Sequence, residues 1–261
     1  MDSTKYRMLA LTDLSKSSMT ILKNAAQLAK AIGGKIEVFY VKAPADVVNY
    51  ENQFSAIRAI QEDSRRAQKR LKTMVRKIEK EENIKITFQI AYGNIKNAIQ
   101  EKISKTKPDI VLLGRRKSKL VNFLSNGITK FLLNECPANV LIAGEDDKFY
   151  SYDDTSLGVY GDVLQKDGIE IINDLNQKNS NPIRFFSIRN TKNTKKNIPQ
   201  HRNTKEKVSY IFSEGTNALD GITSYVSRTN MQLFCISRKH QIKSSLQQMV
   251  YKLDIPVLIL E

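Results

Sequence analysis

Apolar and amphipathic segments alternate along the first 143 residues. Segment 35–41 (KIEVFYV) is rich in β-branched and aromatic residues, which favours a strand. Segment 54–80 instead carries apolar residues at helical spacing, with basic residues on its other face, which predicts a long helix. Read in this way, the pattern predicts strands at 6–11, 35–41, 84–91, 109–113 and 139–143, separated by helices at 19–32, 54–80, 95–104 and 126–134.

This order of strands and helices determines the expected fold class. Residues 6–41 hold a strand, a helix and a second strand, which together form a βαβ unit with parallel strands. Continued alternation predicts an α/β domain with a doubly wound, Rossmann-like parallel sheet. Sheets of this kind bind ligands beyond the carboxyl ends of their strands, so candidate binding residues are sought there.

The rest of the chain repeats the pattern in a weaker form. Segments 93–113 and 215–235 align without a gap at an offset of 122 residues, and 139–143 pairs with 256–260. We interpret this as an internal duplication. The sequence further predicts strands at 157–160, 183–188 and 208–213, a helix at 168–175, and a long loop at 191–207 where the first half has its longest helix. The expected domains are 1–147 and 156–261, joined through the polar and acidic segment 145–155.

Composition and charge narrow the class of protein. Hydrophobic residues make up 41% of the 261 residues and charged residues 26%, which is typical of a globular protein. The net charge is +15, and residues 1–150 hold most of it, with 27 basic and 16 acidic side chains. Nucleic acid, an anionic membrane or a phosphorylated ligand would each fit such a charge, as would a merely basic surface.

Several classes of function lack support in the sequence. Cys136 and Cys235 lie among apolar neighbours, which favours buried free thiols in a reducing cytoplasm. His201 and His240 have no metal-ligand spacing, so we expect no metal site, and no catalytic residue stands out. No segment is long and apolar enough for a membrane span, which predicts a cytoplasmic protein without a membrane partner.

The most informative segment follows the apolar strand at 109–113. Gly114 comes directly after the strand, and Gly127, Ile128 and Thr129 stand at the expected start of the next helix. Glycine permits close approach of backbone to a phosphate, and helix amino termini offer unpaired amide donors. Four basic residues add favourable charge for an anion: Arg115, Arg116, Lys117 and Lys119. An ordinary turn with solvated basic residues is the alternative.

At this point the chain resembles the universal stress proteins, in a tandem two-domain form. The resemblance rests on LALTDLSKSSMTILKNAAQLAKAIGGKIEVFYV at 9–41, on Gly93, on PDIVLLG at 108–114 and on a GxxGx9G[ST]-like segment. It covers nearly the whole chain, strongly in 5–144 and weakly in 157–261. It implies two adenine nucleotide alpha hydrolase-like domains that form a pseudo-dimer, and it leaves a homodimer open.

The nucleotide-binding branch of that family implies roles for particular residues. Asp13 matches the aspartate that contacts the nucleoside, and Val41 matches the position that accepts the adenine. Gly114 and Gly127 match the first and last glycines of the phosphate-binding segment. Asp13 has a second interpretation, since its short side chain would also cap the following helix.

Two departures from the family pattern affect the phosphate segment. Lys117 replaces the middle glycine, and Ile128 replaces the serine or threonine that would bond a phosphate. Thr129 follows one residue late, and the ammonium of Lys117 would supply charge. The implied ligand is ATP or a related phosphorylated molecule, with Mg²⁺ only if ATP is bound, held without substantial turnover.

Two alternatives to nucleotide binding stay open. Ser237-Arg238-Lys239-His240 replaces the motif in the second half, so we expect no ATP there and a packing role that mimics a second subunit. If both sites are degenerate, the protein would be a stress adaptor or scaffold acting through unidentified protein partners. Nucleic-acid binding by the basic helix is not favoured, because acidic residues such as Glu62 and Glu79 interrupt its charge.

Overall fold

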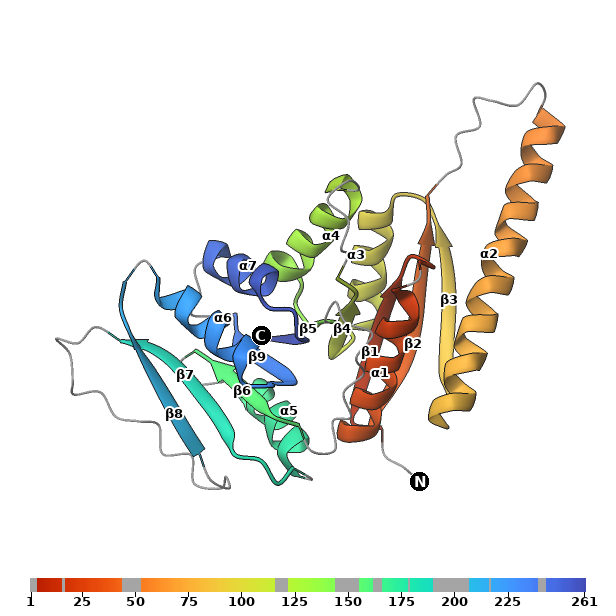
Figure 1. Cartoon of the computed structure of the whole chain (residues 1–261). Coiled ribbons are helices and arrows are strands. Elements are labelled where there is room, and N and C mark those ends of the chain that lie inside the picture. Colours follow the sequence, from red (N-terminus) through yellow and green to blue (C-terminus); the bar gives the residue numbers. More distant parts are fainter. Residues whose placement is uncertain are drawn as a thin grey trace.

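The computed structural model shows one continuous ten-stranded sheet that contains strands of both halves (Figure 1). It describes residues 4–15, 17–43, 53–115, 122–143, 155–161, 166–177, 179–189, 207–215, 217–238 and 243–261. The first half contains β1 (Tyr6–Thr12), α1 (Ser18–Ile32), β2 (Gly34–Lys42), α2 (Gln53–Glu82), β3 (Ile86–Tyr92), α3 (Ile95–Thr106), β4 (Ile110–Leu113), α4 (Asn122–Glu135) and β5 (Asn139–Ile142). The second contains β6 (Leu157–Tyr160), α5 (Lys166–Gln177), β7 (Ile183–Arg189), β8 (Lys207–Ser213), α6 (Ala218–Arg228), β9 (Leu233–Ser237), α7 (Lys243–Lys252) and β10 (Val257–Leu260).

The strand order confirms the predicted fold class and the repeat. The sheet runs β3-β2-β1-β4-β5-β10-β9-β6-β7-β8, so each half has the same internal order and the two halves meet at β5 and β10. That central pair is antiparallel, whereas the neighbouring strands within each half are parallel. Parallel strands joined through helices make each half a doubly wound α/β unit.

The strand register corrects the predicted alignment by one residue. Leu141 on β5 pairs with Leu258 on β10, which agrees with the predicted equivalence of 139–143 and 256–260. Leu141 also pairs with Leu112, and Leu258 with Cys235, so Leu112 and Cys235 are equivalent at an offset of 123 and not 122. The difference matters because a shift of one residue moves a strand side chain to the other face of the sheet.

Two hydrophobic cores cover the two faces of the sheet. Residues of α1, α2 and α5 pack on one face, and residues of α3, α4, α6 and α7 pack on the other (Figure 1). Each core includes side chains from both halves, such as Leu22 with Leu175, and Leu132 with Met249. Complete burial of each such side chain contributes about 1.5–3 kcal/mol, so the two halves share their stabilisation.

Polar contacts reinforce the junction between the halves. Tyr6 in β1 donates its hydroxyl to Asp174 in α5 at 2.6 Å. Asn139 accepts a hydrogen bond from the backbone N–H of Glu261 at 3.0 Å. Burial, followed by the hydrogen bond to Asp174, raises the pKa of Tyr6, which therefore stays a neutral donor at physiological pH. The two halves thus meet through sheet pairing, packed helices and specific hydrogen bonds.

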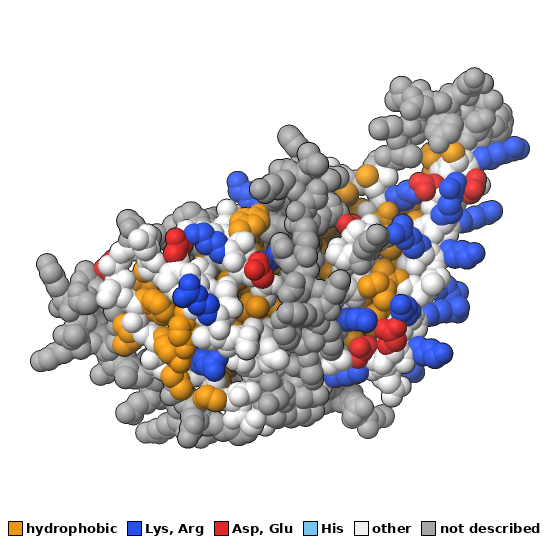
Figure 2. Space-filling model, in the orientation of Figure 1, with side chains coloured by type: hydrophobic (Ala, Val, Ile, Leu, Met, Phe, Trp, Pro, Cys, Tyr) orange, Lys and Arg blue, Asp and Glu red, His pale blue; other side chains and the backbone are white. Residues whose placement is uncertain are grey.

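Helix α2 is the element by which the halves differ most. Its apolar stripe, including Leu71, Val75 and Ile78, is buried against the sheet, while its basic residues face outward along one edge of the molecule (Figure 2).

The predicted loop at 191–207 lies outside the described residues except for Lys207, which begins β8. On β8, Ile211 is 56% exposed, and apolar side chains gather over β7 and β8 in Figure 2.

The cysteines agree with the prediction made from their neighbours. Cys136 and Cys235 are free and buried, and burial raises the pKa of both thiols, which disfavours the reactive thiolate. Both histidines and most of the segment 145–155 lie outside the described residues. Among the residues that are described, no three histidine, cysteine or acidic side chains group as metal ligands do. No helix in the described ranges combines the length and apolarity needed to cross a bilayer.

Candidate functional site

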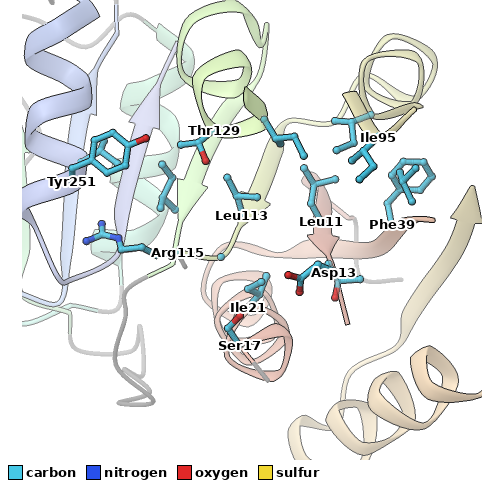
Figure 3. A pocket seen from close by; sticks show the side chains of 17 residues that line it. Leu11, Asp13, Ser17, Ile21, Phe39, Ile95, Leu113, Arg115, Thr129 and Tyr251 are labelled. Atoms are coloured by element: carbon cyan, nitrogen blue, oxygen red, sulfur yellow. The ribbon is translucent and has the colours of Figure 1, made fainter. Parts of the chain in front are cut away.

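A cavity of about 200 Å³ opens beyond the carboxyl ends of β1, β2, β4 and β5. This is the edge at which a doubly wound sheet binds its ligands, and β1 and β4 are adjacent strands whose connections leave in opposite directions. The strands, the amino-terminal parts of α1 and α3, the middle of α4, and helix α7 of the second half all contribute side chains to its wall (Figure 3). The sequence analysis sought its candidate binding residues at this same edge.

Asp13 lies at the turn between β1 and α1, where its carboxylate organises the local backbone. One of its oxygens accepts hydrogen bonds from the Ser15 backbone N–H at 2.9 Å and from the Ser18 hydroxyl at 3.0 Å. Leu14, between Asp13 and Ser15, has a left-handed φ of 59°, a conformation that costs a non-glycine residue about 1–3 kcal/mol. The turn is therefore held in a strained shape with Asp13 at the cavity wall.

The helix-capping interpretation of Asp13 is only partly right. The residue at the cap position of α1 is Ser17, and its side chain makes no capping hydrogen bond. Asp13 reaches the first turn of the helix through the Ser18 hydroxyl instead. Ser17 lines the cavity, so the amino terminus of α1, the positive end of the helix dipole, faces the space where a ligand would lie.

One end of the cavity is apolar. Phe39 and Val41 of β2 line it together with Ile95 and Ile99 of α3. Phe39 and Val41 are almost completely buried, with 2% and 8% of their surfaces exposed. An apolar pocket with a few polar groups at its rim is the usual environment for a planar organic ring.

Gly114 lies at the end of β4, where the packing of α1 requires its small size. A Cβ atom at this position would lie 2.4 Å from Cδ1 and 2.7 Å from Cγ1 of Ile21. Close approach of helix and strand therefore accounts for the glycine without any ligand. Arg115, the next residue, lines the cavity with the nitrogens of its guanidinium group buried.

The phosphate segment differs from the expectation in one structural respect. Helix α4 begins at Asn122, four residues earlier than predicted, because the helical pattern extends back through 122–125. Gly127 consequently lies past the first turn, beyond the amides that a helix leaves unpaired. Ile128 and Thr129 line the cavity, whereas Gly127 is exposed and does not, and a Cβ there would touch nothing within 4 Å.

Most of the predicted site residues come together in this cavity. Of the seven, the lining residues are Asp13, Val41, Gly114, Ile128 and Thr129. Gly127 lies outside the wall, and Lys117 falls outside the described residues.

The sequence did not identify the contribution of the second half. Val250 and Tyr251 of α7 line the cavity, and Tyr251 is largely on the surface, with 57% of the residue exposed. Figure 3 shows the Tyr251 ring at one end of the cavity, near Arg115 and Thr129, with Asp13 toward the other end. No motif marks Tyr251, since its position depends on the pairing of β5 with β10.

Comparisons with known proteins agree with this architecture. A model of the universal stress protein family matches residues 6–144, which is more than half of the chain. None of the curated proteins compared with the sequence matches it. A universal stress protein from Archaeoglobus fulgidus is similar in structure, with a TM-score of 0.69 and 16% identity, covering 98% of this chain and 96% of that one.

Two further structures extend the comparison over the full length. A functionally unknown protein from Pseudomonas aeruginosa has a TM-score of 0.59 and 11% identity, covering 98% of this chain and 92% of that one. The cytoplasmic domain of a prokaryotic cation chloride cotransporter has a TM-score of 0.55 and 11% identity, covering 98% and 95%. At such identities the similarity concerns the fold alone, and ligand chemistry must be argued from the cavity itself.

Proposed function

Because this chain belongs to the universal stress protein family, we propose that it binds ATP or a related phosphorylated nucleoside in the cavity of its first half, without substantial turnover. The observation that carries the proposal is the convergence of Asp13, Val41 and Thr129 on one cavity at the carboxyl edge of the sheet. These residues come from β2, α4 and the turn after β1, so only the folded chain brings them together.

Different parts of the cavity wall suit different parts of the ligand. The apolar end beside Phe39 and Val41 would take the base, with the backbone of Val41 giving its hydrogen bond. Asp13 would accept hydrogen bonds from the ribose hydroxyls, as a carboxylate does in dinucleotide-binding folds. Thr129 would donate its hydroxyl to a phosphate in place of Ile128, which has no donor to offer.

The size of the cavity sets a limit on how much ligand is enclosed. About 200 Å³ is below the roughly 300–1,000 Å³ of pockets that enclose drug-sized molecules. A nucleoside would fill it, and the terminal phosphates would extend toward the surface. Asp13 is the one acidic residue of the described wall, so Mg²⁺ would enter with the phosphates and not through a protein metal centre.

Isothermal titration with ATP and Mg²⁺ tests the proposal. Asp13→Asn keeps an oxygen acceptor for Ser15 and Ser18 while it removes the charge, so the turn should survive and ATP affinity should fall about tenfold or more. Asp220→Asn, on the outer surface of α6, is the matched control and should bind like wild type. Absence of heat at high wild-type concentration, with no nucleotide retained on purification, would refute nucleotide binding.

A specific observation also favours the adaptor alternative. Packing against Ile21 explains Gly114 without a ligand, and Ile128 presents an apolar side chain where a phosphate would need a donor. If titration detects no nucleotide, a scaffold acting through protein partners becomes the better hypothesis. It predicts that Asp13→Asn, which should weaken nucleotide binding, leaves cellular function intact, while disruption of the surface between the halves abolishes it.

A further inference from the structure

We propose that the outward face of helix α2 binds the phosphate backbone of double-stranded nucleic acid without reading its sequence. The binding surface is a row of six basic residues along the helix, which we call the basic stripe. It consists of Arg58, Arg65, Lys69, Lys72, Arg76 and Lys80. This surface is separate from the cavity, since no described residue of α2 lines the cavity wall.

The basic stripe is straight and exposed. At about 100° per residue, its six positions lie within about 80° of one another around the helix axis, and they extend over about 33 Å of the helix. All six residues are exposed. Figure 2 shows Lys and Arg side chains along this edge of the molecule, on the side away from the buried residues Leu71, Val75 and Ile78. A long cationic surface therefore faces solvent.

Acidic residues interrupt the charge of α2 in the sequence but not on its surface. Glu62 forms an ion pair with Arg66 at 3.0 Å, and Glu79 accepts a hydrogen bond from the backbone N–H of Ile86 at 2.9 Å. The other three acidic residues of the helix pair with basic residues outside the stripe: Asp63 with Lys42, Glu81 with Lys23 and Lys77, and Glu82 with Lys30. Among the described residues, no member of the basic stripe has an ion pair. The structure therefore removes the objection that the sequence raised to nucleic acid.

The stability of the helix does not explain the basic stripe. Three pairs of its members are four residues apart: Arg65 with Lys69, Lys72 with Arg76, and Arg76 with Lys80. Like charges at this spacing destabilise a helix, and α2 is held on the sheet by its buried apolar residues without them. A partner with repeated negative charge would relieve this repulsion, because each cation would then face an anion.

The composition of the basic stripe favours nucleic acid over a membrane. A helix that binds a membrane surface inserts apolar side chains beside its basic residues. Ile57 and Ile60 are 52% and 39% exposed, but they lie in line with the buried apolar residues of α2 and not with the stripe. A nucleic-acid duplex carries one negative charge per roughly 1.7 Å of its axis, so phosphates are available along the whole stripe. Contacts with phosphates carry no sequence information, which predicts binding without sequence preference.

Fluorescence anisotropy with labelled duplex DNA and the full-length protein tests the inference. Wild type should bind two duplexes of unrelated sequence equally, with an affinity that falls steeply between about 50 and 200 mM salt. Combining Lys69→Gln, Lys72→Gln and Arg76→Gln should lower the affinity at least about tenfold. The slope of log K against log salt should become less steep by about 2–3, since each lost phosphate contact removes about 0.9. Glutamine is a good helix former, so circular dichroism should show α2 intact.

A second triple variant is the matched control, because it removes the same number of positive charges outside α2. It combines Lys30→Gln, Lys105→Gln and Lys252→Gln, each at an exposed lysine that already pairs with a carboxylate. At about 0.1 M salt, charges more than about 10 Å from the bound DNA are largely screened, so the affinity of the control should change less than about threefold.

Three outcomes would overturn the inference. The first is absence of DNA binding by wild type at about 50 mM salt. The second is an equal loss of affinity in the two triple variants, because net charge and not the basic stripe would then be responsible. The third is wild type that sediments with phosphatidylserine vesicles but does not bind DNA, which would assign the stripe to a membrane. None of these outcomes bears on nucleotide binding in the cavity, which the titration with ATP measures separately.

Discussion

Arg115 and Arg238 occupy equivalent positions in the two halves. Leu113 of β4 pairs with Ile142 of β5, and Ile236 of β9 pairs with Ile259 of β10, so Leu113 and Ile236 correspond. Each arginine lies two residues after that position. Arg115 lines the cavity of the first half. Arg238 is instead used entirely within the protein.

The environment of Arg238 shows how the second half uses the corresponding edge of its sheet. The guanidinium donates to the carbonyl oxygens of Ala138 at 3.1 Å and Leu132 at 3.4 Å, and also to that of Cys136. It pairs in addition with Glu261, and its side chain is only 14% exposed. A cation at the carboxyl end of α4 is favoured by the helix dipole, so this arginine joins the two halves.

The comparison teaches that one position of a repeated fold can join the two halves in one copy and line a cavity in the other. The second half has Ser237 where the first has Gly114, and its loop reaches the last strand over a shorter stretch of chain. Arg238 occupies this edge in the second half. The corresponding edge of the first half, beside Arg115, contains the cavity. Expected ATP binding in the first half alone follows from this asymmetry and stays a prediction.

Removal of the Arg238 side chain should have the largest effect on this comparison. Arg238→Ala would leave buried carbonyl oxygens and Glu261 without their partner, which should lower the free energy of unfolding by about 3 kcal/mol. Chemical denaturation measures the change. Arg66→Ala, which breaks an exposed ion pair with Glu62, is the control and should change stability by less than about 0.5 kcal/mol. Equal stability of the two variants would mean that Arg238 does not join the halves.

Gly114→Ala should have an intermediate effect on the free energy of unfolding. It tests whether packing against Ile21 accounts for a glycine at this position. The new Cβ would overlap with Ile21, so the free energy of unfolding should fall by about 1–2 kcal/mol. Ile21→Val removes the Cδ1 atom nearest the overlap and should restore part of that loss in the double variant. Thermal or chemical denaturation gives both values, and an undiminished stability of Gly114→Ala would reject the packing explanation.

Gly127→Ala should have the smallest effect, with the opposite sign. The residue lies within α4 with open space around it, so alanine should raise the free energy of unfolding by up to about 1 kcal/mol through its higher helix propensity. Gly221→Ala in α6 is the control from the second half, where the Cβ would lie 3.2 Å from the ring of Phe212, so the gain should be smaller. A destabilised Gly127→Ala would show that α4 does not pack as described.

Titration of the same Gly127→Ala protein with ATP sharpens the comparison further. Because Gly127 does not line the cavity, we expect the Kd for ATP to stay within about twofold of wild type. A stable variant that has lost ATP would mean that the ligand contacts this turn directly and that the family's last glycine retains its role.

The sequence by itself determined the pattern of strands and helices, the repeat, and the edge of the sheet where a ligand would bind. Local information suffices for these features: alternating apolar segments define the βαβ units, and Asp13 and Gly114 follow directly after strands. Chain topology then requires the ends of parallel strands to meet at one edge. Asp13, Val41 and Gly114 line the cavity for this reason, while Ile128 and Thr129 reach it from helix α4.

Only the tertiary structure decided the register of the repeat, the start of α4 and the part played by Tyr251. A shift between offsets of 122 and 123 is invisible in two weakly similar segments, but it decides whether Cys235 faces one core or the other. Tyr251 lines the same cavity as Arg115 and Thr129 because β5 pairs with β10, a strand more than a hundred residues away in the chain. Contacts of that range arise from packing of whole elements, which no local pattern of residues encodes.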